Sequence, residues 1–189
     1  MDSDLLISHQ PAFNTKADSL PLQPGQTPPT ISQPFQILVA SLGLKDLSDA
    51  ISIASNARIA PFTNSYRHAC LTSLQVSLHP TGAAPSFPTT VSLVWVPNNS
   101  TATPEQILSV YGAKQFCIGG AVNSVTPLTI PCNLTNVNPV IKSSTTFLDT
   151  PKLLLSSTAP PTPPTVTTCS VTISGVIQLH SPLLQSSAS

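Results

Sequence analysis

Charged side chains are scarce in this chain of 189 residues. Seven Lys plus Arg and seven Asp plus Glu make up 7% of the sequence, and the formal net charge is +0. Soluble proteins usually have about a quarter of their residues charged, and a net charge keeps monomers dispersed. We therefore expect much of this surface to be covered by other protein. Near the N-terminus, Lys16 stands against Asp2, Asp4 and Asp18, which excludes a polybasic nucleic-acid-binding arm.

Membrane, secretion and metal signals are also lacking. No apolar run approaches the roughly 20 residues of a membrane helix, and residues 1–13 lack the basic and long apolar regions of a signal peptide. The four cysteines form no CxxC pair, and none has a histidine at ligand spacing: Cys70, Cys117, Cys132 and Cys169. We expect buried, reduced thiols in a protein that is not secreted, with no metal site and no membrane partner.

Catalytic motifs are missing as well. The sequence contains no nucleophile elbow, no glycine-rich phosphate loop and no zinc-protease motif, and its seven acidic residues are scattered. Aromatic residues make up 5% and do not cluster, which argues against a carbohydrate-binding face. We predict that the chain is not an enzyme and holds no cofactor.

What the chain does contain is typical of β-structure. It has 21 prolines and several short runs in which apolar and polar residues alternate. Leu74, Val76 and Leu78, for example, alternate with polar neighbours, and Gly175 is placed to form a bulge. Eight strands are predicted: Pro34–Leu42, Ala50–Ala54, His68–His79, Thr90–Val96, Lys114–Gly120, Thr126–Pro131, Lys152–Thr158 and Thr168–His180. This number favours an all-β fold, either an eight-stranded antiparallel jelly-roll sandwich or another two-sheet sandwich, with one or two short helices in its connections.

The connections carry their own signals. A helix is predicted from Thr103 to Gly112, because Thr103 and Gln106 have capping-box spacing and Pro104 suits the first turn. A second short helix is predicted near Asn133–Val140 on weaker signals. Two proline-stiffened loops, Pro80–Pro88 and Ala159–Thr165, become the DE and HI loops if the strands are lettered B to I. A jelly roll brings these two loops to the same end.

The chain divides into two parts. Residues 1–30 are polar and broken by proline, so we expect an arm that is flexible or ordered only by neighbouring subunits. Residues 31–189 are the predicted jelly-roll shell domain.

Many short motifs follow one order between Pro34 and Leu184: Tyr66–Ala69, His79–Thr81, Phe87–Val91, Trp95–Pro97, Phe116–Ala121, Pro151–Leu154, Ile173–Gly175 and His180–Leu183. Together they resemble tymovirus coat proteins of the turnip yellow mosaic type. The resemblance implies a plant-virus capsid subunit that forms a T=3 icosahedral shell of pentamers and hexamers around single-stranded, positive-sense RNA. It also implies assembly in the host plant cell, residence in the virion, and polyamines or small cations beside the RNA. The competing interpretation is a cytosolic all-β carbohydrate- or protein-binding module.

The resemblance also points to His68 and His180 as residues that face the RNA. Alternation in the last predicted strand places His180 on the polar face with Gln178, in agreement. Unbroken alternation would place His68 on the same face as the apolar Leu74. For His68 to face the RNA, the strand must bend near Cys70 or begin after His68.

Overall fold

The structure, a computed structural model, describes residues 30–120 and 126–183. These residues form nine strands, one α-helical turn and one 3₁₀ helix. In chain order the elements are β1 (Thr30–Leu42), β2 (Leu47–Ser52), α1 (Ala60–Thr63), β3 (Tyr66–Pro80), β4 (Thr89–Pro97), η2 (Pro104–Ser109), β5 (Lys114–Ile118), β6 (Leu128–Pro131), β7 (Val140–Lys142), β8 (Pro151–Thr158) and β9 (Cys169–Pro182).

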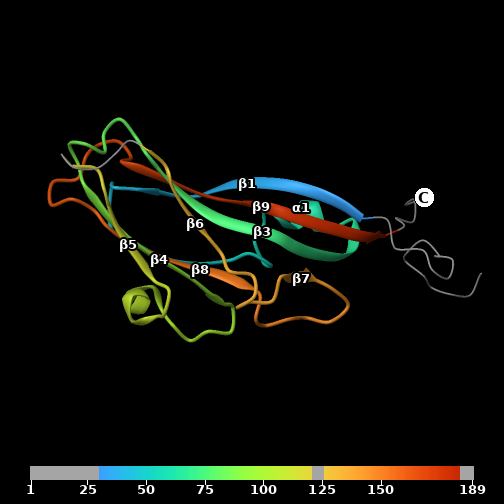
Figure 1. The fold of residues 1–189 in the computed structure, drawn as a ribbon. Helices are drawn as coiled ribbons and strands as arrows, with labels where there is room; N and C mark the ends of the chain where they lie inside the picture. The colour runs from blue at the N-terminus through green and yellow to red at the C-terminus, as the bar shows by residue number, and fades with distance from the viewer. Residues whose placement is uncertain (1–29, 121–125, 184–189) are drawn as a thin grey trace, which may run out of the picture.

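The strands make two antiparallel sheets that face each other (Figure 1). One sheet has the order β1-β9-β3-β6, with β7 also paired to β3, and the other has the order β2-β8-β4-β5. Along the chain, most consecutive strands change sheet; the exceptions are β4 and β5, which share one sheet, and β6 and β7, which share the other. This arrangement is typical of a jelly roll. The predicted fold class is confirmed, and each of the eight predicted strands has a counterpart. The short β7 is an addition.

The core lies between the sheets and follows the predicted alternation. Leu74, Val76 and Leu78 of β3 are no more than 3% exposed, and they pack in one cluster with Val91 and Leu93 of β4. A smaller cluster lies on the opposite face of the four-stranded sheet, where η2 covers it: Val94, Val96, Ile107 and Leu154. Both faces of β4 are therefore apolar at this point.

The helix predicted from Thr103 to Gly112 is wrong in type and length. Residues 104–109 form a 3₁₀ helix, and the Thr103 side chain makes no capping hydrogen bond. A three-residue turn aligns residues i and i+3, so Ile107 is buried while Leu108 is 61% exposed. Ile107 is thus the buried residue of this helix. Gly112, at φ +87°, does follow the helix in a left-handed conformation.

The weaker helix near Asn133–Val140 is also wrong. The Asn133 carboxamide oxygen accepts the Thr135 N–H at 3.0 Å, and that of Asn138 accepts the Val140 N–H at 2.9 Å. These side chains close local turns that compete with a helix, and Val140 begins β7. The one-turn α1, with Pro61 near its start, was not predicted.

Gly175 does not hold the bulge that the sequence suggested. The pairing of β3 with β9 shifts between Leu71 and Ser73, so Thr72 is the extra residue. Gly175 lies opposite Leu74 and serves close approach instead. A Cβ at this position would collide with the Ser73 carbonyl oxygen and lie 3.1 Å from the Phe35 ring.

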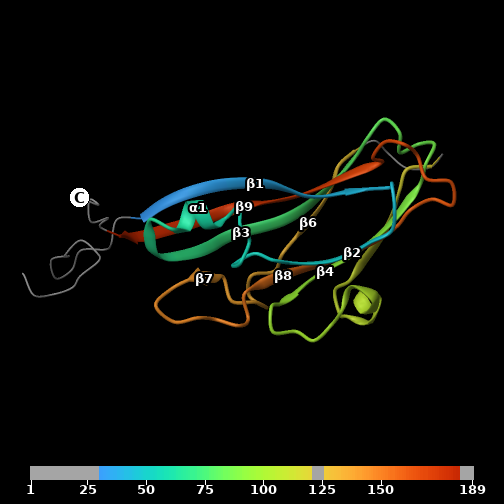
Figure 2. The same cartoon turned by 180° about the vertical axis from the view of Figure 1, so that it is seen from behind.

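The two ends of the molecule differ (Figures 1 and 2). At one end the DE and HI loops meet, as predicted: the Thr81 N–H donates to the Thr168 carbonyl at 2.8 Å. Buried hydroxyls close this tip, because Thr89 Oγ1 lies 2.6 Å from Thr168 Oγ1, which donates to the Leu42 carbonyl at 3.2 Å. We call these three residues the hydroxyl clamp.

Both described chain ends lie at the opposite end of the molecule. Thr30 pairs with His180, and the Leu183 N–H donates to the Ser65 carbonyl. The predicted arm comprises residues 1–30. Only Thr30 of this arm is described, and residues 1–29 fall outside the described residues. No helix in residues 30–120 or 126–183 is long and apolar enough to cross a membrane.

Candidate nucleic-acid interface

The structure brings the two predicted histidines together. His68 of β3 and His180 of β9 are directly opposite in the antiparallel pairing, although they are far apart in the chain. Their rings stack, with centroids 4.7 Å apart and planes inclined by 18°. Thr30 of β1 flanks His180 on its other side. The pair therefore sits on three adjacent strands at the end of the sheet where the described chain begins and ends.

The bulge at Thr72 explains how His68 reaches the outer face. Beyond the bulge, Leu74 and Val76 point into the core, and before it Ala69 and Leu71 do so, at 0% and 2% exposed. Because the bulge inserts one residue, odd-numbered residues face the core before it and even-numbered residues face the core after it. The irregularity that the sequence required near Cys70 is thus present, two residues further on.

His180 lies on the outer face without the help of a bulge. It alternates with Ile177 and Leu179, which are buried at 0% and 3% exposed, so it shares the outer face with the exposed Gln178. The structure thus agrees with the alternation seen in the sequence, and RNA contact by His180 stays a prediction.

The electrostatics of the pair favour the neutral form of His68. Its pKa is lowered, first because burial disfavours the charged ring and then because His180 and Arg67 add like charge. Lys142 does not belong to this site, because it pairs with Ala69, whose side chain faces the core; its Nζ donates to the Thr63 carbonyl at 2.7 Å. The like charge beside His68 comes from His180 and Arg67, so an anion bound there would favour proton uptake by His68.

Ser181 marks the site in a way that the sequence did not reveal. It has φ +57°, and among the described residues it is the one non-glycine with positive φ. Such a conformation costs about 1–3 kcal/mol and tends to persist at functional sites. Its hydroxyl lies 3.5 Å from His180 Nδ1, so the distorted backbone positions a second polar group beside the ring.

This arrangement can bind but shows no catalytic machinery. Neutral imidazoles donate and accept hydrogen bonds and stack on bases, and protonated ones pair with phosphate. A third outward histidine, His79, is already bonded through Nε2 to Thr172 Oγ1 at 2.9 Å. Within residues 30–120 and 126–183, no three His, Cys, Asp or Glu side chains gather as metal ligands.

Comparison with known proteins gives a consistent result. The family model described as "Tymovirus coat protein" matches residues 20–189. The capsid protein of Kennedya yellow mosaic virus (strain Jervis bay) is 61% identical over 188 residues, which cover 100% of both chains. A structure of Desmodium yellow mottle tymovirus superimposes with a TM-score of 0.85 at 58% identity, covering 93% of this chain and 100% of the other. An empty head of turnip yellow mosaic virus gives 0.84 at 47% identity, covering 90% of each.

Proposed function

Because this chain belongs to the tymovirus coat protein family, we propose that it assembles into a T=3 shell around the genome of a plant virus. The family membership makes it a structural capsid protein rather than an enzyme, and it does not favour the cytosolic binding module. The finer proposal is that three quasi-equivalent copies form pentamers and hexamers in the host plant cell. The genome enclosed is single-stranded, positive-sense RNA.

The observation that carries this proposal is a jelly roll with almost no charge. Seven cationic side chains per chain cannot neutralise an RNA genome, so burial between subunits must supply most of the assembly free energy. Polyamines or small cations then balance the remaining phosphate charge. The similarity to an empty head of turnip yellow mosaic virus is in keeping with a shell that does not need RNA.

The histidine pair is the proposed RNA contact. Neutral rings bond to or stack on bases, and a protonated ring pairs with phosphate. Because the pKa of His68 is lowered in the free subunit, its proton uptake lags behind that of an unfolded chain. Its contribution to stability therefore falls as pH drops below about 6.5, and a bound phosphate offsets this loss.

The arm is proposed to act between subunits. Thr30 leaves the sheet beside His180, so residues 1–29 start from the RNA-binding end of the subunit. Pentamers and hexamers offer different neighbours, and we expect the arm to be ordered to different extents in the two settings.

Expression followed by electron microscopy and sedimentation tests the shell. We expect uniform megadalton particles that persist in about 1 M salt, where the Debye length is about 3 Å. A species of a few subunits would instead support the binding module. Particles that dissociate under that salt at neutral pH would contradict assembly by apolar burial.

Paired variants test the RNA contact. His68→Ala combined with His180→Ala should leave shells intact but lower their RNA content, with a loss that grows between pH 7.5 and 5.5. His79→Ala is the matched control, because that ring lies on the same face but is bonded to Thr172. If the original protein, the double variant and His79→Ala contain equal amounts of RNA at both pH values, the proposed RNA contact of His68 and His180 is wrong.

A further inference from the structure

Residues that pair directly from strand to strand form a row across the four-stranded sheet. One such row has oppositely charged residues at its two ends. Asp49 of β2 pairs with Leu155 of β8, Leu155 pairs with Leu93 of β4, and Leu93 pairs with Lys114 of β5. β2 and β5 are the two edges of this sheet. Asp49 and Lys114 therefore lie at the same height on opposite sides of the sandwich, and side chains in one row share a face.

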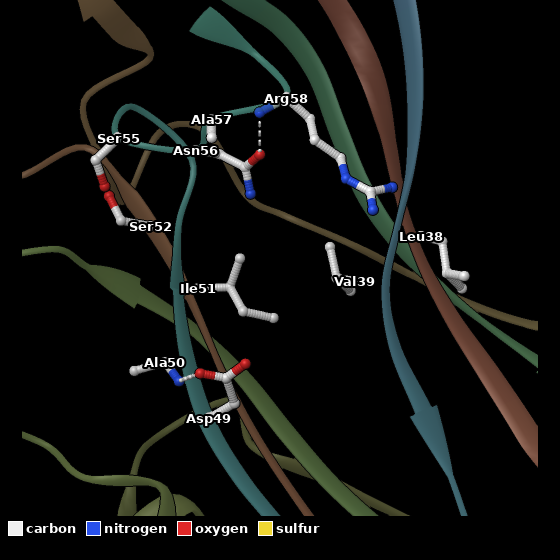
Figure 3. Close-up of a pocket in the computed structure, with 10 residues that line it drawn as sticks. All are labelled: Leu38, Val39, Asp49, Ala50, Ile51, Ser52, Ser55, Asn56, Ala57 and Arg58. Carbon is white, nitrogen blue, oxygen red and sulfur yellow. Dashed lines mark hydrogen bonds between the residues drawn. The ribbon is translucent and has the colours of Figure 1, made fainter.

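A groove lies at the Asp49 edge, between β1 and β2 (Figure 3). Its volume is about 440 Å³, and its lining includes Leu38, which is 48% exposed. Asp49 lies at one end, where its carboxylate accepts the neighbouring Ala50 N–H at 2.8 Å and no other described donor. The Arg58 side chain crosses the other end toward β1, away from Asp49. Among the described residues, the Arg58 guanidinium has no hydrogen-bond or ion-pair partner.

A second groove lies at the Lys114 edge. It is about 460 Å³ in volume and includes Trp95, Lys114 and Tyr111 in its lining. Along β4, β5 pairs only from Thr89 to Leu93, so β4 runs on past the start of β5 and leaves that edge open. Tyr111 is 101% exposed, an unusual position for a large ring. In the part of the chain that the structure describes, the Lys114 ammonium also lacks a partner.

We propose that these two grooves are the two halves of one contact between neighbouring copies of this chain. Lys114 of one copy pairs with Asp49 of the next, and Tyr111 covers Leu38 and stacks on the Arg58 guanidinium. The inference rests on the proposed shell and specifies how subunits join side by side within it.

The geometry favours a second copy as the occupant. A closed ring needs two different, complementary surfaces on each subunit, and they must superimpose after rotation about the ring axis. In the proposed shell the histidine end faces the RNA and the DE and HI tip faces outward, which sets the strands roughly along the ring axis. Rotation about such an axis keeps the height of each residue, so the two ends of one row meet. The charges are opposite at those ends. Tyr111 and Lys114 are close in sequence, so they can reach the Arg58 and Asp49 ends of the groove together.

Charge reversal tests the contact. Asp49→Lys and Lys114→Asp each place like charges across every ring contact, and each should lower the yield of shells at least tenfold. The combined variant restores opposite charges with exchanged signs, and its yield should return to within about threefold of the original protein. Lys45→Asp is the matched control, because it makes the same charge change on an exposed lysine in the β1–β2 connection.

Several readouts separate the outcomes. Circular dichroism and urea unfolding of the subunits show whether each variant is folded, as expected because both residues are exposed. Shells formed by both single variants, or a folded combined variant that fails to assemble, would overturn this contact and leave the shell itself in place. Failure of the unchanged protein to form shells would instead reject the proposed function.

Discussion

The hydroxyl clamp at the DE and HI tip predicts a measurable coupling between Thr89 and Thr168. Both residues are 0% exposed, and their hydroxyl oxygens are 2.6 Å apart. Each hydroxyl has one proton, and the contact of Thr168 Oγ1 with the Leu42 carbonyl, at 3.2 Å, is shorter than that of Thr89 Oγ1 with the Phe87 carbonyl, at 3.4 Å. We therefore take Thr168 to donate to Leu42 and Thr89 to donate to Thr168. Replacing either threonine with valine keeps the shape of the side chain and removes one hydroxyl.

The magnitudes follow from what each change leaves behind. Thr89→Val removes one hydrogen bond but leaves Thr168 bonded to Leu42, which costs about 1 kcal/mol. Thr168→Val leaves the Thr89 hydroxyl buried with only a 3.4 Å contact to the Phe87 carbonyl, which costs about 2 kcal/mol. The double variant leaves no orphaned hydroxyl and should cost about 1–2 kcal/mol, less than the sum of about 3 kcal/mol.

Equilibrium urea unfolding of dissociated subunits measures the three free energies. In thermal unfolding, each 1 kcal/mol corresponds to about 2–4 °C in a domain of this size. Thr90→Val is the control, because this neighbouring threonine is only half-buried, has no side-chain hydrogen bond in the described structure, and should change stability by less than about 0.5 kcal/mol. Costs of the two single changes that add within about 0.5 kcal/mol in the double variant would refute the clamp.

Two further predictions concern packing and thiols. Gly175→Ala should destabilise the subunit by about 1–3 kcal/mol, because the new Cβ collides with the Ser73 carbonyl; Gly82→Ala, with nothing within 4 Å, should be neutral in the same melting experiment. At pH 8, a thiol reagent should modify the exposed Cys117 quickly. Cys132 and Cys169 should react only after unfolding, since burial raises their thiol pKa values to about 12 and about 11; rapid modification of either in the folded subunit would argue against this packing.

The strands were predictable where sequence period and burial agree. β3 and β9 alternate over many residues, and a period of two has no competing explanation. The three-residue β7 has no period to detect. The signals around Thr103 and Pro104 suit a 3₁₀ turn as well as an α-helix, so only the packing of Ile107 against β4 and β8 decides the type.

The candidate site was predictable in part for the same reason. Alternation alone places His180 on the outer face. The face of His68 depends on the bulge at Thr72, which no glycine or proline marks and which arises from pairing with β9. The stacking of the two rings is likewise a property of the pairing. The strained Ser181 carries no signal, because serine is ordinary in turns and strands alike.

The positions of the described chain ends have a consequence for engineering. Thr30 and Leu183 both leave the subunit at the histidine end, whereas the DE and HI loops lie at the other. If the histidine end faces the RNA as proposed, a peptide joined next to Thr30 or Leu183 would enter the compartment that holds the RNA, whereas an epitope grafted between Ala159 and Thr165 would be displayed on the opposite side. The two ends of the subunit would thus serve different purposes, one for carrying cargo and the other for displaying epitopes.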